Sequence, residues 1–173
     1  LTDDDAEGVW HTWMNDQDMV SLLGRSPDPI SIKMQKDYLA AVEASDNRRI
    51  FGVCEIEDEK LIGIASLSDI DRYHKKAQTG LFIGDKNFRS LRFALETLSI
   101  LTEVGLIHFE LNRLDASALS LNSASHNLNK ALGWSFVGIK RKSHFYNGKF
   151  VDSTLYEILR EDWLISVKRP SLK

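Results

Sequence analysis

Two polar clusters in this sequence have residue types and spacing that could do chemistry. The first spans residues 84–92, where an apolar stretch ends and a helical pattern begins, and it contains Arg89 and Arg92. Free N–H groups at a helix start bind anions, and guanidinium groups would strengthen such a site. The same spacing fits a solvated basic turn equally well, so both interpretations stay open at this point.

The second cluster pairs Asn122 with Ser125, shortly before Gly133. A helix cap at Asn122 or Ser123 would explain this pattern without any further role. The five histidines, at positions 11, 74, 108, 126 and 144, lie on separate segments without metal-ligand spacing. Each fits a surface or hydrogen-bonded histidine better than a catalyst, and we expect no metal site.

Capping residues and apolar spacing predict the helices that position these clusters. Thr2 and Asp5 form a capping-box pattern, Ser31 is a good N-cap, and Gly133 is a good helix stop. Apolar residues three and four positions apart support the long helix in the middle of the chain. The expected helices, caps included, are residues 2–15, 31–44, 92–107 and 124–132.

Apolar and alternating runs predict the strands, which are residues 50–56, 61–67, 80–83, 114–118, 134–140 and 151–159. Residues 57–60 form a polar hairpin turn, and Asn147-Gly148 favours a tight hairpin turn. Cys54 lies inside an apolar run and is expected to be a buried core thiol. The order of elements predicts a mixed sheet with helices packed on it.

Composition limits the class of protein. With 173 residues, 43% of them hydrophobic, the chain is expected to form a single domain over residues 1–173. A net charge of −3 gives no basic footprint for nucleic acid. A single cysteine excludes an internal disulfide. No apolar stretch approaches the length of a membrane span, and the N-terminal residues do not show the basic-then-apolar pattern of a signal peptide. We therefore expect a cytoplasmic chain without a nucleic-acid or membrane partner.

Four ordered motifs resemble the GCN5-related N-acetyltransferase (GNAT) family. They are W-M-N-D at residues 13–16, T-G-L-F-I-G-D-K-N at 79–87, N-S-A-S through K-A-L-G-W at 122–134, and Y-N-G-K-F-V-D with I-L-R-E-D-W at 146–163. The nearest branch is that of the ribosomal-protein-alanine, spermidine and amino-sugar acetyltransferases. Each motif alone is weak, but together they cover nearly the whole chain.

The resemblance implies an α/β (α+β) fold of the GNAT type. This fold is a mixed, mostly antiparallel twisted sheet of about six to seven strands, flanked by about four helices, in which the fourth and fifth strands splay apart. It also implies that an amine attacks acetyl-CoA directly, without a covalent enzyme intermediate.

The resemblance further implies the site residues. The pantetheine arm of acetyl-CoA would pair with the fourth strand, and its pyrophosphate would sit on the following loop and helix start. Asn122 would contact the pantetheine region and Ser125 would lie near the thioester sulfur, which makes these two the expected catalytic residues. The expected cofactor-binding residues are Leu81, Phe82, Ile83, Arg89, Ser90, Leu91, Arg92, Phe93, Ala94, Asn122, Ser125 and Asn129.

The phosphate loop departs from the family pattern at two positions. Arg92 replaces the middle glycine, and Ser90 stands where this branch usually has another glycine. Glycine lets a phosphate approach the backbone closely, and any Cβ narrows that space. Arg92 would either bind the pyrophosphate through charge-assisted hydrogen bonds or fill the site.

The proton-transfer positions depart as well. Asn129 occupies the place of a tyrosine that protonates the leaving thiolate, so Ser125 or an ordered water would serve instead. Gln78 replaces a glutamate that is one candidate base. The nearest ionisable alternatives are Asp69, Asp71 and His74, and a base relayed by water is a further alternative.

These features predict an acetyl-CoA-dependent N-acetyltransferase for a small primary amine, with an amino sugar favoured over a polyamine because few carboxylates are near the acceptor end. A protein N-terminus and a polyamine are the rival acceptors. A degenerate transferase fold that binds a ligand without catalysis is the alternative of a different class, motivated by Arg92 and Asn129.

Aromatic residues are expected to serve mainly in packing. Trp10, Trp13, Phe51 and Phe82 fit core positions better than ligand platforms. The hairpin residues at 144–146 lie in a segment that in this family often flanks the acceptor site or a dimer contact. Homodimers are common in this branch, so a homodimer is part of the expectation.

Overall fold

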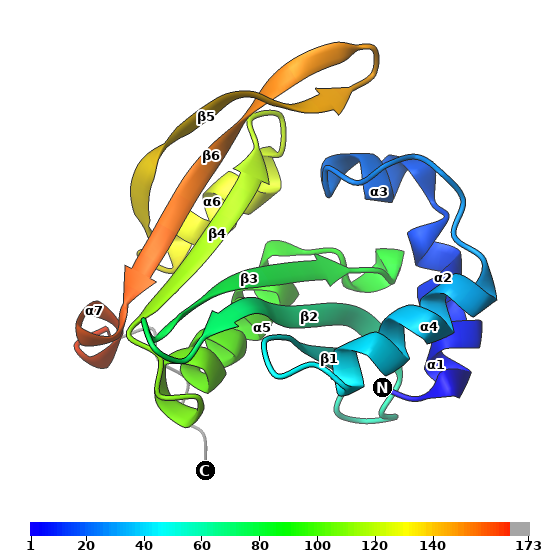
Figure 1. The fold of residues 1–173 in the computed structure, drawn as a ribbon, viewed down its shortest axis with the longest axis horizontal. Helices are drawn as coiled ribbons and strands as arrows, with labels where there is room; N and C mark the ends of the chain where they lie inside the picture. Colours follow the sequence, from blue (N-terminus) through cyan, green and yellow to red (C-terminus); the bar gives the residue numbers. More distant parts are fainter. Residues whose placement is uncertain (167–173) are drawn as a thin grey trace.

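The structure, a computed structural model, describes residues 1–166 and is built on a six-stranded sheet with strand order β1-β2-β3-β4-β6-β5 (Figure 1). Neighbouring strands are antiparallel except for the parallel pair β3 and β4, which confirms the expected mixed, mostly antiparallel sheet. The strands are β1 (Arg49–Cys54), β2 (Leu61–Asp71), β3 (Lys76–Ile83), β4 (Arg113–Leu119), β5 (Ser135–Tyr146) and β6 (Lys149–Leu159).

The described residues contain more helices than the four expected. They are α1 (Asp3–Glu7), α2 (Val9–Met14), α3 (Gln17–Leu22), α4 (Ile32–Glu43), α5 (Leu91–Glu103), α6 (Ser123–Ala131) and α7 (Arg160–Leu164). A 3-10 turn (Lys86–Phe88) precedes α5, and a π-helical turn (Val104–His108) follows it. Among residues 1–166, none of these helices has the length and apolar character that crossing a membrane requires.

The single helix predicted over residues 2–15 is wrong, because the chain breaks at Gly8. The capping box between Thr2 and Asp5 forms as expected, but Gly8 has φ −88° and ψ −137°, which ends α1 and starts α2. The unpredicted α3 begins at Asp16, whose carboxylate accepts hydrogen bonds from the backbone N–H groups of Asp18 and Met19. The N-terminal segment is therefore three short helices, of which α3 lies across from the β5–β6 hairpin (Figure 1).

The sheet splits between β3 and β4, so the expected splay is present, but between the third and fourth strands of this chain and not the fourth and fifth. β3 and β4 pair through only three residue pairs, the last of which joins Gln78 to Asp115. Just beyond, the hydroxyl of Thr79 donates to the backbone carbonyl of Asp115 (3.2 Å). Both strands continue past this point, β3 to Ile83 and β4 to Leu119, and Figure 1 shows them diverging.

Two apolar clusters hold the halves together. The larger packs the sheet against α5, α6 and α7, and Leu67, Leu114 and Trp163 in it are fully buried. The smaller joins the N-terminal helices to β3, with Trp13 and Phe82 in an edge-to-face contact of 6.2 Å between ring centroids. The predicted core role is confirmed for the buried Trp10 and Trp13, whereas Phe51 and Phe82 are half-buried against these clusters.

The prediction that Cys54 is buried is wrong. Its side chain is exposed, because β1 is an edge strand and Cys54 is its last residue, where the register with β2 shifts. The apolar run that suggested burial continues to Ile56, but that side chain is 86% exposed and lies in the turn. An apolar sequence alone does not indicate which end of an edge strand is buried by neighbouring elements of the fold.

Candidate active site

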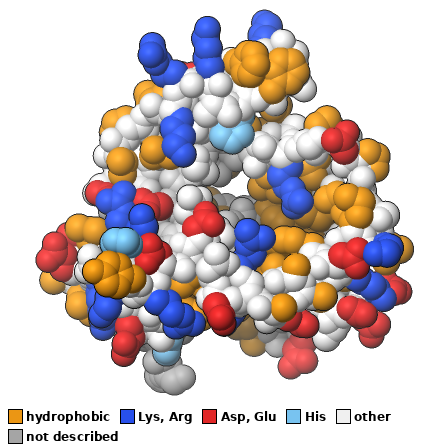
Figure 2. All heavy atoms as spheres, in the orientation of Figure 1, with side chains coloured by type: hydrophobic (Ala, Val, Ile, Leu, Met, Phe, Trp, Pro, Cys, Tyr) orange, Lys and Arg blue, Asp and Glu red, His pale blue; other side chains and the backbone are white. Residues whose placement is uncertain are grey.

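A groove of about 630 Å³ lies where the N-terminal ends of α5 and α6 approach the end of β3. The end of α3 forms its opposite wall through Leu22 and Leu23. Figure 2 shows this face of the molecule hollowed between the β5–β6 hairpin and the N-terminal helices, with apolar side chains inside the hollow. The predicted cofactor residues that line the groove are Leu81, Phe82, Ile83, Arg89, Ser90, Leu91, Ala94, Asn122 and Ser125.

Two helices, α5 and α6, begin at this groove. The side chain of Ser90, the N-cap of α5, makes no capping hydrogen bond, so N–H groups of the first turn of α5 stay available for an anion. α6 begins at Asn122, whose side chain does cap its helix. An elongated ligand with an anionic part fits a groove of this kind.

Arg89 stabilises the turn that follows β3 through two hydrogen bonds to backbone carbonyls. Its Nε donates to the carbonyl of Ile83 (3.1 Å) and its Nη2 donates to the carbonyl of Gly84 (2.9 Å). Arg92 behaves differently, because its side chain is exposed and lies over the ring of Phe93, 5.9 Å from the ring centroid. Neither Arg92 nor Phe93 is among the residues that line the groove, so the Arg92 side chain does not fill it.

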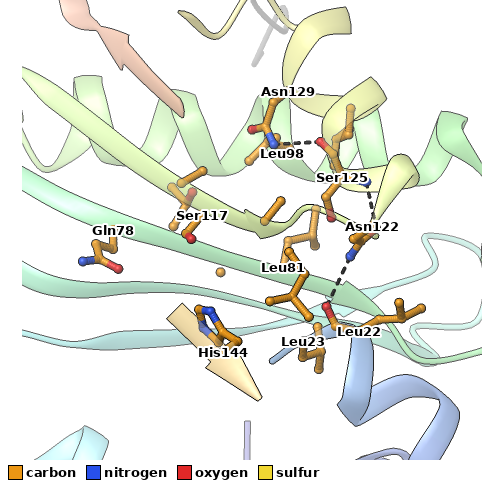
Figure 3. Close-up of a pocket in the computed structure, with 16 residues that line it drawn as sticks. Leu22, Leu23, Gln78, Leu81, Leu98, Ser117, Asn122, Ser125, Asn129 and His144 are labelled. Carbon is orange, nitrogen blue, oxygen red and sulfur yellow. Dashed lines mark hydrogen bonds between the residues drawn. The ribbon is translucent and has the colours of Figure 1, made fainter. Parts of the chain in front are cut away.

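A second cavity, of about 260 Å³, occupies the split between β3 and β4 (Figure 3). Its walls come from β3 at Gln78, from β4 at Ser117, from α6 at Asn129 and from β5 at His144. The groove and this cavity share one set of lining residues, so they meet there: Leu22, Leu23, Leu81, Asn122, Ser125 and Leu128. Two ligands that entered from the two sides would therefore meet beside Ser125.

The expected helix cap at Asn122 is confirmed, but this side chain does more than cap. Its Oδ1 accepts a hydrogen bond from the backbone N–H of Ser125 (3.1 Å), and its Nδ2 donates to the carbonyl of Leu22 at the end of α3 (3.3 Å). Asn129 lines the second cavity and is 4% exposed. Its Nδ2 donates to the carbonyl of Ser125 (2.8 Å), while its Oδ1 has no protein partner.

The ionisable residues named from the sequence as alternative bases do not line either cavity. Asp69 and Asp71 lie at the end of β2 and His74 lies in the turn to β3, where the carboxylate of Asp71 pairs with Nδ1 of His74 at 2.7 Å. Hydrogen bonds from the backbone and side chain of His74 lower the pKa of Asp71. This cluster therefore stabilises a turn at the closed end of the split.

His144 is the residue that sequence reasoning missed. Among the described residues that line the second cavity, it is the sole ionisable side chain. Nδ1 lies 2.9 Å from Oγ of Ser143, and that hydroxyl lies 2.9 Å from Oγ of the fully buried Ser153. The available signal was the position of His144 in the C-terminal hairpin.

Comparisons with known proteins agree with this geometry. A family profile described as an acetyltransferase (GNAT) domain matches residues 1–155. The uncharacterized N-acetyltransferase YoaA of Bacillus subtilis is 25% identical over 162 residues, which are 92% of this chain and 90% of that protein. The uncharacterized N-acetyltransferase p20 of Bacillus licheniformis is 25% identical over 123 residues, 71% of this chain and 67% of that protein.

Solved structures share the fold at low sequence identity. A spermidine N-acetyltransferase from Vibrio cholerae, solved in complex with CoA and spermine, superimposes with a TM-score of 0.88. The two chains are 20% identical, and the match covers 95% of each. One conclusion follows from three findings: the split sheet, the groove at two helix starts, and the family match over most of the chain. This chain belongs to the GNAT family of acetyltransferases and is an acyltransferase.

Proposed function

We propose that this chain transfers the acetyl group of acetyl-CoA to the primary amine of a small molecule, as a member of the ribosomal-protein-alanine, spermidine and amino-sugar branch. One observation carries the proposal. The groove at the helix starts and the cavity in the split of the sheet meet at Ser125, so a donor and an acceptor can enter from different sides and meet. Such an arrangement favours direct transfer in a ternary complex.

The groove suits acetyl-CoA as the donor. Beyond Gln78 the edge of β3 that faces β4 has no strand partner, so backbone groups of residues 81–83 would pair with the amide groups of the pantetheine arm, apart from the Ile83 carbonyl, which already accepts from Arg89. The first turn of α5 would supply N–H groups for the pyrophosphate, beside the groove residues Arg89, Ser90, Leu91 and Ala94. Ser125 and Asn122 would then lie beside the thioester.

The transfer step follows from ordinary acyl chemistry. The unprotonated amine attacks the thioester carbonyl carbon, the new N–C bond forms, and the C–S bond breaks to release CoA thiolate. Cys54 lies at the exposed end of β1 and lines neither cavity, so the chain offers no cysteine to carry the acetyl group at this site. The amide of Asn129 is a poor acid, so the Ser125 hydroxyl or a water would protonate the thiolate.

We call the second cavity, in the split between β3 and β4, the acceptor cavity, because we propose that the amine binds there. Its lining favours an amino sugar over a polyamine. Its polar lining is made of hydroxyl, amide and imidazole groups, among them Gln78, Thr79 and Ser117, with no carboxylate among the described residues that line it. A polyamine carries several positive charges, which carboxylates would have to match. The spermidine N-acetyltransferase with the same fold keeps a polyamine as the second candidate. A protein N-terminus is the third candidate.

Calorimetry with acetyl-CoA is the first test, with R92A and R92G beside the parent chain. We expect the parent chain to bind, and weaker binding by both variants would show that Arg92 contacts the pyrophosphate. Binding by R92G but not by the parent chain would support a degenerate fold whose groove is closed to the donor. An acceptor panel of glucosamine, spermidine and a peptide with a free N-terminus follows, and acetylation of peptide or spermidine but not glucosamine would refute the amino-sugar acceptor.

A homodimer remains part of the proposal. β5 is an edge strand of the sheet and exposes apolar side chains together with its partner β6. These exposed side chains are Phe136, Val137, Ile139, Phe145 and Phe150. Exposed apolar side chains beside an unpaired strand edge favour association with another chain. Light scattering would test this, and a mass near 19.7 kDa at all concentrations would argue against it.

A further inference from the structure

Among the described residues that line the acceptor cavity, the imidazole of His144 is the one side chain that can serve as a base. An alkylamine is mostly protonated at neutral pH, and its nitrogen cannot attack a carbonyl until that proton leaves. We propose that His144 is the general base that deprotonates the acceptor amine. This inference rests on the proposed acetyltransferase function and adds to it a residue that takes the proton.

The position of the ring is built into the fold. His144 lies opposite Val151 in the β5–β6 hairpin, which brings the ring over Gly24 in the segment after α3. A Cβ on Gly24 would lie 2.9 Å from Cδ2 and 3.3 Å from Nε2 of His144, and Gly24 has φ +68°. Any other residue there would be strained and would press on the imidazole. Figure 3 shows the ring in the same cavity as Ser117 and Leu81.

A chain of two hydroxyl groups can hold the ring in the form a base needs. Oγ of Ser143 lies 2.9 Å from Nδ1 of His144 and 2.9 Å from Oγ of Ser153. When Nδ1–H donates to Ser143, and Ser143 donates to Ser153, the lone pair is left on Nε2. Ser153 is fully buried, so its hydroxyl, the last group in this series of hydrogen bonds, is held in place. Ser143 is thus a positioning residue for His144.

The elements packed around the ring bring no competing charge into the cavity. The end of α3 contributes Leu22 and Leu23, β4 contributes residues 116–119, and β3 contributes residues 78–81, none of which is charged. The guanidinium of Arg25, next to Gly24, donates to the sulfur of Met14 (3.1 Å). On the hairpin itself, the carboxylate of Asp152 accepts from the backbone N–H of Lys142 (2.7 Å).

The protons and bonds balance as follows. Nε2 of His144 takes one proton from the acceptor ammonium, and the free amine attacks the carbonyl carbon of acetyl-CoA. The N–C bond forms, the C–S bond breaks, and the second amine proton ends on the CoA thiolate. The imidazolium returns its proton to solvent, so the products are the N-acetylated acceptor, CoA thiol and one proton.

The test compares H144Q with H108Q, a matched substitution of an exposed histidine at the end of the π-helical turn. We expect both variants to bind acetyl-CoA within about twofold of the parent chain. For protonated amines, H144Q should lose about 100-fold or more in kcat/KM, the size of effect typical of a general base. H108Q should keep the parent rate, and S143A should lose about tenfold while keeping the same pH profile shape.

A second readout separates a base from a structural role. Hydroxylamine is largely unprotonated at neutral pH, so its acetylation does not need a base to remove an ammonium proton. H144Q should therefore react with hydroxylamine at close to the parent rate, and its loss with alkylamines should shrink as pH rises. Equal loss with both nucleophiles, or an H144Q rate within threefold of the parent for alkylamines, would overturn the inference while leaving the acetyltransferase function intact. A parent chain that neither binds acetyl-CoA nor acetylates any acceptor would overturn both.

Discussion

Asn122 and Leu22 are 100 residues apart in the chain, yet Nδ2 of Asn122 donates a 3.3 Å hydrogen bond to the carbonyl of Leu22. Oδ1 of the same side chain accepts from the backbone N–H of Ser125. The side-chain amide of Asn122 thus links the start of α6 to the end of α3 through hydrogen bonds. Both residues line the groove and the acceptor cavity, so this contact forms part of the wall where the two meet.

Substitutions at Asn122 separate its two contacts. N122A should lower the free energy of unfolding by about 1 kcal/mol, the usual cost of losing a helix cap. N122D keeps an oxygen for the N–H of Ser125 but loses the donor to Leu22, so it should lose less stability and still weaken acetyl-CoA binding. Urea denaturation and calorimetry measure the two effects. If N122D bound acetyl-CoA as the parent does, the link to α3 would not be required for the groove.

Gly84 is required by the close approach of Trp13. A Cβ at Gly84 would lie 2.0 Å from the nearest atom of the Trp13 ring, a buried side chain that cannot move aside freely. G84A should therefore lower the free energy of unfolding by about 3 kcal/mol through overpacking. G138A is the control, because a Cβ at Gly138 meets no atom within 4 Å. Thermal denaturation of both variants would check this, and equal melting temperatures would contradict it.

The pair formed by Lys60 and Asp85 should make stability depend on pH. The Lys60 ammonium donates to the carboxylate of Asp85 (2.6 Å), and this hydrogen bond, with that from the N–H of Asn87, lowers the pKa of Asp85. A carboxyl group with a lowered folded pKa stabilises the fold above its unfolded pKa, and this contribution is lost as the pH falls through the folded pKa.

The stabilisation from the Lys60–Asp85 pair should therefore begin to fall when the pH nears 3.8, the ordinary pKa of aspartate, and should continue to fall below it. D85N should show a smaller drop in melting temperature between neutral and acid pH than the parent chain. D37N removes an exposed carboxylate that pairs with the exposed Lys33, and it should keep the parent profile because such surface pairs contribute little. Identical acid profiles for D85N and the parent chain would refute this account.

Gln35 is a buried amide without protein partners. Its side chain is 3% exposed, neither of its polar atoms has a protein hydrogen-bond partner, and it lines a cavity of about 440 Å³ with Trp10 and Tyr38. Such a group costs about 1–3 kcal/mol, so Q35M should leave stability unchanged or raise it. Urea denaturation would measure this. A loss above about 1 kcal/mol would show that the amide serves a polar ligand or bound water there.

Local features were predictable because short-range chemistry determines them. Ser31 caps α4 through the N–H of Met34 (3.2 Å), as its position before an apolar run indicates. Asn147 and Gly148 both have positive φ, 45° and 78°, as a tight hairpin turn requires. Gly133 has φ +81° directly after α6. In each case the signal and the structure lie within a few residues.

The missed features depend on distant parts of the chain. His144 reaches the acceptor cavity because the register of β5 on β6 and the glycine at position 24 together make room for its ring. Cys54 is exposed because it ends an edge strand, a fact set by the strand order and not by its neighbours in sequence. Motif resemblance named most of the residues expected to bind acetyl-CoA that line the groove, but only packing shows which side chains line the second cavity.

The split of the sheet also determines how its backbone exchanges with water. Beyond Gln78 on β3 and Asp115 on β4, the facing strand edges have no ladder partner, although they lie in the middle of the sheet. Amide hydrogens on those edges should exchange with deuterium faster than those in the paired strands on either side. A donor that pairs with β3 would slow that central exchange, so the backbone itself would report occupancy before any acceptor is known.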